Sequence, residues 1–465
     1  MQRNYVHKVK FGDWKLPLYI YITIPSIAVF GLNEFAVRFP SALLGTITVL
    51  LLYFLVEKLM EGKNEVEKKF NDVVPLLSSF FLAILPWHVF MSRNASESNV
   101  AVFLTTAGLL LFFKSFKKHI YLIPSCILLI LPLYTYHGNH IFSTLLIIVL
   151  ALLYWRKIIH NTNIAPSGVV LFILFGMIVS QTLFGADKTK ISGLFPLGDI
   201  ARVHNEIELK RARHNSMILG KLIHNKFTYL GKTIANNYIR GFSPEFLVVT
   251  GGANPQHTIP DFGNLYFWQM ICIPLALFFL FYRKIENRWF LLFWLLISPI
   301  AASITRDAPH TNRMMGFLPL PAILSAYGLN SLIFYTRAYM RKFLALSAFG
   351  VICFYFALYL DAYFVQFPKL ATKQWGGIYK NMSLSLSKYS KTFPEITIAR
   401  PTESPYIYYV FYTQYDPYRF QSNVLRYPET DEGFQHVHKL DTITFENIDW
   451  EYAHLIPERG CILIG

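Results

Sequence analysis

The sequence predicts a mainly α, polytopic helical membrane protein with interfacial helices and a small α/β extracytoplasmic C-terminal domain. Of its 465 residues, 54% are hydrophobic and only 15% are charged, so apolar segments must dominate the chain. Basic residues recur in every second loop between the apolar runs, and the composition turns polar after the last run. These three observations predict the fold class before any single motif is considered.

Ten apolar runs approach the length of about 20 residues that a helix needs to cross the hydrocarbon of a bilayer. The fourth and fifth are separated only by the tight turn His137–His140. The expected crossings are Phe39–Val56, Val73–Phe90, Asn99–Phe113, Ile120–Tyr136, Ile141–Trp155, Gly168–Phe184, Leu265–Tyr282, Trp289–Ile304, Met314–Tyr335 and Phe343–Tyr363.

The charge of the short loops predicts the orientation, because Lys and Arg accumulate on the cytoplasmic side. One set of loops carries groups such as Lys58 to Lys69 and Arg337 to Lys342, whereas the alternate loops carry only Arg93, Arg306 and Arg313. We expect the alternate loops, the long loop Gly185–Asn264 and the C-terminal tail to lie outside. Membrane topology therefore accounts for most of the formal charge of +15, and no nucleic-acid partner is expected.

Two segments are expected to lie along the membrane surface. The run Lys15–Leu32 is short and broken by Pro17 and Pro25, which favours a helix in the outer interface. In the long outer loop, apolar residues from Met217 to Tyr238 follow helical spacing and are flanked by basic residues. Such a basic amphipathic helix favours lipid headgroups or an anionic lipid substrate over a solvated loop.

The chain is expected to form three regions. Residues 1–37 form an extracytoplasmic segment with the interfacial helix, residues 38–363 the transmembrane domain with the outer loop 185–264, and residues 364–465 an extracytoplasmic α/β domain. The last contains a helix-like run Thr372–Tyr389, a strand-like run Glu395–Ala399 and an aromatic run Pro405–Tyr418. The four cysteines have no paired spacing, so neither a disulfide framework nor a metal site is expected from them.

Four external stretches are richer in polar residues than membrane anchoring requires. They are Asp13–Tyr19, the turn from Arg93 to Glu97, Asn254–Asp261 and Arg306–Arg313. A lipid phosphate suits such a place, because its tail stays in the bilayer while Arg and Lys neutralise its oxygens. A carboxylate could then act as general base toward an acceptor hydroxyl. The competing interpretation is that Arg93 is a snorkelling anchor and His310 a polar helix cap.

Several motifs carry a family resemblance. The segment Asn33–Leu43 follows a Lys-x-Pro-Leu motif at Lys15, Pro86-Trp87-His88-Val89 precedes Arg93, and Arg306-Asp307-x-Pro309-His310-x-x-Arg313 joins two spans. In this order and on one membrane face, they resemble the polyprenyl-phosphate-dependent membrane glycosyltransferases of the GT-C superfamily, which include protein O-mannosyltransferases and lipid A aminoarabinose transferases. The resemblance runs from about Gly12 through the last span.

The resemblance implies inverting transfer of a sugar from a polyprenyl-phosphate donor to a glycan, lipid or protein acceptor. The active site would face outside, in a bacterial or archaeal plasma membrane. If the chain is active as it stands, Glu97 and Asp13 are the nearby carboxylates expected to act as the catalytic base. The resemblance allows a divalent metal ion as a cofactor. One family branch has an acidic residue near the metal at the position of Trp14. No residue of this chain is therefore assigned as a metal ligand. The donor-binding candidates are Lys15, Arg93, His257, Arg306, Asp307, His310 and Arg313.

One departure from the family leaves alternatives open. Family members begin with a spanning helix and an acidic outer loop, whereas Met1–Phe11 contains no acidic residue, so we expect a truncated or mis-started chain. The alternatives are a non-catalytic lipid-binding relative and a ligase or polymerase of lipid-linked oligosaccharides. A transporter is disfavoured because no internal repeat occurs, and a nucleotide-sugar donor because no Gly-rich phosphate loop precedes a helix.

Overall fold

The structure is a computed structural model that describes residues 15–62, 65, 70–184, 200–372, 375–389, 393, 395–399, 404–429, 435–449, 451 and 461–464. The chain divides into two compact units. One contains Leu16–Ser26 and Val37–Leu370, and the other contains Ile27–Ala36 and Ala371–Gly465. The three-region division expected from the sequence stays a prediction.

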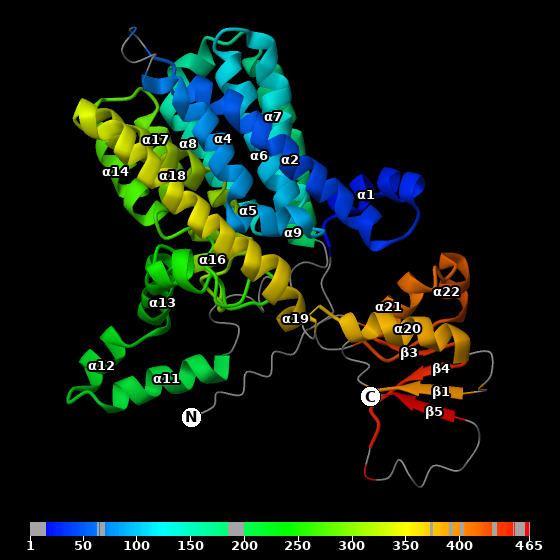
Figure 1. Cartoon of the computed structure of the whole chain (residues 1–465). Coiled ribbons are helices and arrows are strands. Elements are labelled where there is room, and N and C mark those ends of the chain that lie inside the picture. The colour runs from blue at the N-terminus through cyan, green and yellow to red at the C-terminus, as the bar shows by residue number, and fades with distance from the viewer. Residues whose placement is uncertain are drawn as a thin grey trace. The chain divides into compact units, whose positions relative to one another are not determined.

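The larger unit is a bundle of apolar helices, and each of the ten apolar runs contains a helix (Figure 1). The mainly α, polytopic fold class is thereby confirmed. Its elements are α2 (Glu34–Leu59), α4 (Val73–Ile84), α5 (Pro86–Arg93), α6 (Glu97–Ser115), α7 (Leu122–Ile130), α8 (Asn139–Ile159), α9 (Ile164–Phe184), α14 (Gln269–Tyr282), α15 (Arg288–Ile297), α16 (Ile300–Ser303), α17 (Leu320–Tyr335) and α18 (Ala338–Asp361), with α1 (Pro17–Phe30) before them.

By length and composition, four helices in the described part of the chain are long and apolar enough to cross a membrane, or five if a bent pair is one span. The other apolar helices are shorter, with 10–17 residues. The number of ten crossings therefore stays a prediction, whereas the run of apolar helices that underlies it is present in the structure.

One expected continuous helix is broken. The run Val73–Phe90 forms two helices, α4 and α5, that meet at Leu85 with a bend of 56°. Pro86 has no backbone N–H to continue the α4 hydrogen-bond ladder, and it forces the preceding Leu85 into the extended conformation that the structure shows. The bend turns α5 away from the axis of α4.

Close helix packing depends on small residues at a few positions. In α17, which packs against both α4 and α14, a Cβ added at Gly328 would lie 2.0 Å from the backbone oxygen of Cys272 in α14. The glycine therefore sets the distance between α14 and α17, as small residues do where membrane helices approach closely.

The segment between α9 and α14 also departs from the expected single helix over Met217–Tyr238. It forms α12 (Met217–Ile223) and α13 (Lys226–Arg240), preceded by α11 (Ile200–Ala212). Asn225 separates α12 from α13, because its side chain accepts hydrogen bonds from the backbone N–H groups of Phe227 and Thr228. This N-cap competes with continuation of the first helix.

The second unit contains a small α/β domain, as expected. The strands β1 (Glu395–Ile398), β2 (Leu425–Arg426), β3 (Val437–Leu440), β4 (Ile443–Phe445) and β5 (Cys461–Ile464) form a sheet in the order β2-β3-β4-β1-β5. β1 pairs in parallel with β4 and β5. The helices are α20 (Gly377–Tyr389), α21 (Tyr406–Tyr412) and α22 (Pro417–Asn423), and the buried core includes Leu386, Ile396, Tyr409, Leu440 and Phe445.

Replacing Gly328 by Ala should destabilise the bundle by about 1–3 kcal/mol, because backbone atoms of α14 must move to admit the methyl group. The matched control is Gly350→Ala in α18, where an added Cβ meets no atom within 4 Å. That control should be neutral or slightly stabilising, since Ala favours a helix interior over Gly. Thermal unfolding of the purified protein in detergent measures both, and equal Tm values for the two variants would contradict the packing argument.

Candidate functional site

Glu97 begins α6 immediately after the connection from α5. Ser96 caps this helix, since its hydroxyl accepts a hydrogen bond from the backbone N–H of Asn99 at 3.3 Å. The half-buried Glu97 carboxylate thus occupies the first turn of α6. The positive end of the helix dipole stabilises a negative charge at this position.

Arg93, at the last residue of α5, is exposed and lies against aromatic rings far away in the sequence. Its guanidinium carbon is 5.1 Å from the ring centroid of Tyr363 and 4.8 Å from that of Phe364. Both rings belong to the π-helical turn Ala362–Gln366 that follows α18. These cation–π contacts hold the guanidinium plane while its N–H groups keep access to solvent.

A buried polar network fixes α5 against α2 and α6. Ser92 Oγ lies 3.4 Å from His88 Nε2 and donates to Asn99 Oδ1 at 3.3 Å. Asn99 Nδ2 in turn donates to the Ser41 carbonyl at 2.9 Å. A Cβ at Gly45 would collide with Ser92 Oγ. Since buried polar groups are costly unless they are hydrogen-bonded, this network holds the segment that carries Arg93 in one position.

The second polar turn, Arg306–Arg313, is organised around Asp307. The Asp307 carboxylate accepts a hydrogen bond from Arg313 and lies 3.7 Å from His310 Nε2. Arg313 also donates to Thr305 Oγ1 at 3.0 Å. Arg306 is exposed, whereas His310 is buried. Asp307 and Arg313, both expected to contact the donor, therefore also pair with each other.

The charges of this turn are fixed by its environment. Burial lowers the pKa of His310 well below its ordinary value, and the neighbouring Arg313 cation adds to that effect. The imidazole is therefore neutral at pH 7. Burial by itself would raise the pKa of Asp307, but the Arg313 guanidinium holds it below its ordinary value. Asp307 is an anion paired with a cation at all ordinary pH values.

The two turns are joined directly. The Ser98 hydroxyl donates to the Asn312 side-chain oxygen, and Ser96 Oγ lies 2.9 Å from Ser98 Oγ. Because Ser98 follows Glu97 and Asn312 precedes Arg313, the contact places the start of α6 beside the Arg306–Arg313 turn. Two stretches more than 200 residues apart in the sequence thus lie side by side.

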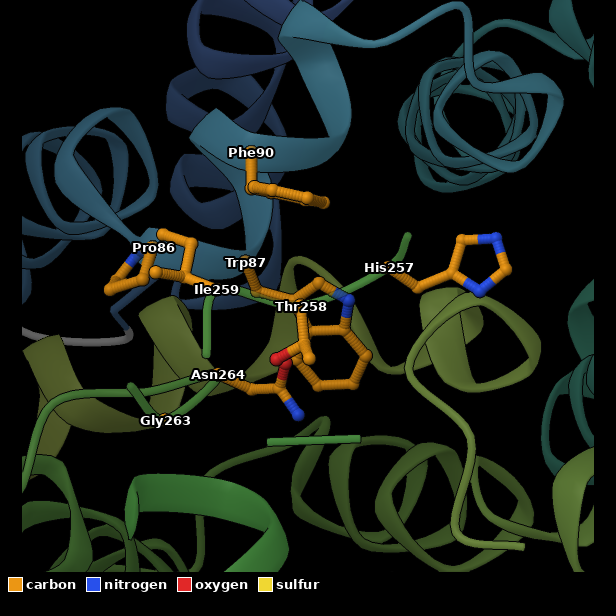
Figure 2. A pocket seen from close by; sticks show the side chains of 8 residues that line it. All are labelled: Pro86, Trp87, Phe90, His257, Thr258, Ile259, Gly263 and Asn264. Atoms are coloured by element: carbon orange, nitrogen blue, oxygen red, sulfur yellow. The ribbon is translucent and has the colours of Figure 1, made fainter. Parts of the chain in front are cut away.

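His257 joins the same region, with its ring centroid 5.0 Å from that of His310. It also lines a cavity of about 10 Å³ together with Trp87, Phe90, Thr258 and Asn264, a volume close to the minimum for one water molecule. Figure 2 shows the His257 imidazole directed away from the Trp87 and Asn264 side chains. The backbone N–H of Trp87 donates to the Asn264 carbonyl at 3.2 Å, which ties α5 to this loop.

Asp13 and Lys15 stay predictions. Asp13 lies outside the described residues. Lys15 is exposed and belongs to the compact unit that contains the C-terminal domain. Sequence reasoning missed Ser98, Asn312, Tyr363 and Phe364. Ser96, the N-cap of α6, is a readable signal for the start of that helix, but no sequence signal pairs Ser98 with Asn312 or Arg93 with rings 270 positions away.

In the part of the chain that the structure describes, no three His, Cys, Asp or Glu side chains gather as metal ligands. The chemistry that these residues themselves offer is a carboxylate at a helix N-terminus, a guanidinium held on aromatic rings, and a turn with a fixed ion pair. Such a set can bind an anion and accept a proton.

Fold and site together define an integral membrane protein with a polar surface at one end of a helical bundle. Residues 14–131 match the family model for dolichyl-phosphate-mannose-protein mannosyltransferases. The resemblance to the polyprenyl-phosphate-dependent membrane glycosyltransferases is thereby confirmed. Over this segment, which includes Lys15, Arg93 and Glu97, the chain is similar to that class of membrane glycosyltransferase.

Other comparisons are more distant. Among curated proteins, no match is found. Two solved structures of ArnT from Cupriavidus metallidurans, one in the apo state and one bound to undecaprenyl phosphate, each share 12% identity with this chain and cover 86% of it and 74% of their own chain. Their TM-scores are 0.46 and 0.44.

The free energy of unfolding should fall as the pH drops from 7 to 5, because unfolded His310 takes up a proton that the folded site rejects. The loss is at most about 1.4 kcal/mol per pH unit for one group. The lowered pKa of Asp307 acts only at more acidic pH, where the carboxylate becomes protonated. Unfolding in denaturant at several pH values measures the slope.

His310→Gln should flatten this slope, since the titrating imidazole is gone. The matched control is His204→Gln, which removes an exposed imidazole on α11 and should keep the wild-type slope. If His310→Gln and wild type lose stability equally between pH 7 and 5, His310 is not held neutral in the fold.

Proposed function

We propose that this chain transfers a sugar from a polyprenyl-phosphate donor to an acceptor hydroxyl on the outer membrane face, with inversion at the anomeric carbon. The observation that carries the proposal is the junction of the Glu97 turn with the Arg306–Arg313 turn through Ser98 and Asn312. It gathers a carboxylate and several cations at one end of the bundle. The family match over residues 14–131 supports the same class of chemistry.

In the proposed reaction, the acceptor oxygen attacks the anomeric carbon and the bond from that carbon to the phosphate oxygen breaks. Glu97 takes the proton of the acceptor hydroxyl, and the bonding electrons leave with the lipid phosphate. A single displacement of this kind inverts the anomeric configuration. Glu97 suits the role of base because it is half-buried at the first turn of α6 and within reach of solvent.

The departing phosphate would be stabilised by fixed cations. Arg93 and Arg306 are exposed, so we assign the phosphate contacts to them first. Arg313 is engaged with Asp307 and Thr305, so we propose that it shapes the turn and contributes its charge at longer range. His310 would border the donor as a neutral hydrogen-bonding group, with the His257 ring beside it. Asp13 and Lys15 stay in the proposal as outer-segment candidates.

A non-catalytic lipid-binding relative is the second candidate function. Asp307 is engaged by Arg313, so we assign the role of base to Glu97 at the first turn of α6. If Glu97 does not act, the same cations would bind a lipid phosphate without turnover. Activity and lipid retention, measured on the same variants, separate the two candidates.

Glu97→Gln should lower sugar transfer by about 10²-fold or more, because a positioned general base contributes that much. Retention of the polyprenyl-phosphate lipid should stay at the wild-type level, since the amide preserves the shape of the carboxylate. Transfer of radiolabelled sugar in reconstituted vesicles measures the first effect and lipid extraction the second. Glu206→Gln on α11 is the control and should behave as wild type; unchanged turnover in Glu97→Gln would remove Glu97 from the base role.

Arg93→Ala should raise the apparent KM for the lipid-phosphate donor about tenfold, the loss expected for one charge-assisted hydrogen bond. Arg93→Lys should recover only part of this loss, because an ammonium lacks the guanidinium fork. Tyr363→Leu removes one ring beneath Arg93 and should weaken donor binding less than Arg93→Ala. An unchanged KM in Arg93→Ala would contradict the phosphate contact.

A further inference from the structure

A larger cavity lies at the other end of α2. It has a volume of about 260 Å³ and is lined by Tyr53, Glu57, Lys58, Glu61, Asn71 and Asp72, among others. Glu57 follows Ser41, the α2 residue of the candidate site network, by 16 helical positions, which corresponds to about 24 Å along the axis. The cavity is therefore separate from the proposed transfer site, and its ligand is independent of that proposed function.

The lining of this cavity favours a cation. Among the described residues that line it, Glu57, Glu61 and Asp72 contribute three carboxylates, against the one positive charge of Lys58. The cavity also surrounds the last turn of α2, where the negative end of the helix dipole adds to the same field. Glu61 is partly neutralised by Lys117 at 2.8 Å, so Glu57 and Asp72, both exposed, carry most of the attraction.

Asn71 supplies an independent observation. Its side chain is only 6% exposed, and its Nδ2 donates to the Met60 carbonyl at 2.6 Å. Among the described residues, its Oδ1 accepts no hydrogen bond, although Asn71 lines the cavity. A buried amide oxygen without a donor costs free energy. A ligand that brings N–H donors into the cavity would satisfy it.

The required ligand is a small cation that carries hydrogen-bond donors. An ammonium group has three N–H donors and one positive charge, which matches the Asn71 oxygen and the two carboxylates. A metal ion fits less well, because no three His, Cys, Asp or Glu side chains in the described ranges converge as ligands.

The surfaces beside the cavity indicate where the ammonium comes from. Leu50 and Phe54 on α2 and Leu76 and Phe80 on α4 are exposed apolar side chains, between 39% and 62% accessible. Such surfaces suit acyl chains, and Lys58 beside the carboxylates suits a phosphate. We propose that this cavity binds a phosphoethanolamine headgroup through Glu57, Asp72 and Asn71, with the lipid tails lying along α2 and α4.

The test uses the full chain, reconstituted in nanodiscs of phosphatidylcholine with a minor fraction of phosphatidylethanolamine and then extracted into mild detergent. Native mass spectrometry counts the retained lipids. Wild type should retain phosphatidylethanolamine in preference to phosphatidylcholine, whose trimethylammonium has no N–H donor. Glu57→Gln and Asp72→Asn should each lower this retention about tenfold, as expected for one charge-assisted hydrogen bond.

Glu286→Gln is the matched control, since Glu286 is an exposed carboxylate paired with Lys157 and does not line the cavity. It should retain lipid as wild type does. A second arm adds soluble glycerophosphoethanolamine to protein in phosphatidylcholine alone. Binding of this soluble headgroup, weakened by Glu57→Gln and without lipid retention, would assign the same ammonium site to a soluble amine. No binding in either arm, or equal binding in Glu57→Gln and Glu286→Gln, overturns the proposal.

Discussion

The hydrogen bond between Ser98 and Asn312 is the contact on which the candidate site depends. It joins the start of α6 to the turn before α17, and each side is held by its own interactions. Ser96 caps α6, while Asp307, Arg313 and Thr305 form a closed set of polar contacts in the turn. The helix turn that carries Glu97 and the turn rich in cations thereby lie beside each other, although each would be an ordinary membrane-surface feature by itself.

The bilayer constrains how the candidate site can be built. In hydrocarbon, polar groups must find partners within the protein, and α5 illustrates the consequence. Pro86 bends the chain out of α4, and Ser92, Asn99 and Ser41 hydrogen-bond to one another inside the bundle. The polar side chains of α5 thus lock its position, and Arg93 at its end is placed against Tyr363 and Phe364. A network that stabilises the helices also orients a proposed ligand contact.

The two ends of α2 have different electrostatic character. Near Ser41 the neighbouring polar residues lead toward Arg93 and the Arg306–Arg313 turn, whose cations suit a phosphate. Near Glu57 the cavity is lined by carboxylates in a part of the sequence where the loops are otherwise basic. Although the overall charge is +15, the cavity near Glu57 is locally negative. We therefore expect different ligands at the two ends of α2.

The sequence by itself determined the helical membrane class, the positions of the apolar helices, the small α/β domain and the family resemblance. These follow from local signals: apolar length, composition and short motifs. It also marked the two polar turns that hold Glu97 and Asp307. The break at Leu85 was not predicted, although Pro86 is present in the sequence. A single helix was predicted over Met217–Tyr238, because the helical spacing of its apolar residues was given more weight than the capping residue Asn225. Only the tertiary structure decided that Ser98 meets Asn312, that Arg93 lies on Tyr363 and that Asp307 is paired with Arg313. The first two contacts join residues separated by more than 200 positions, so helix packing sets their geometry, whereas the third depends on how the Arg306–Arg313 turn folds.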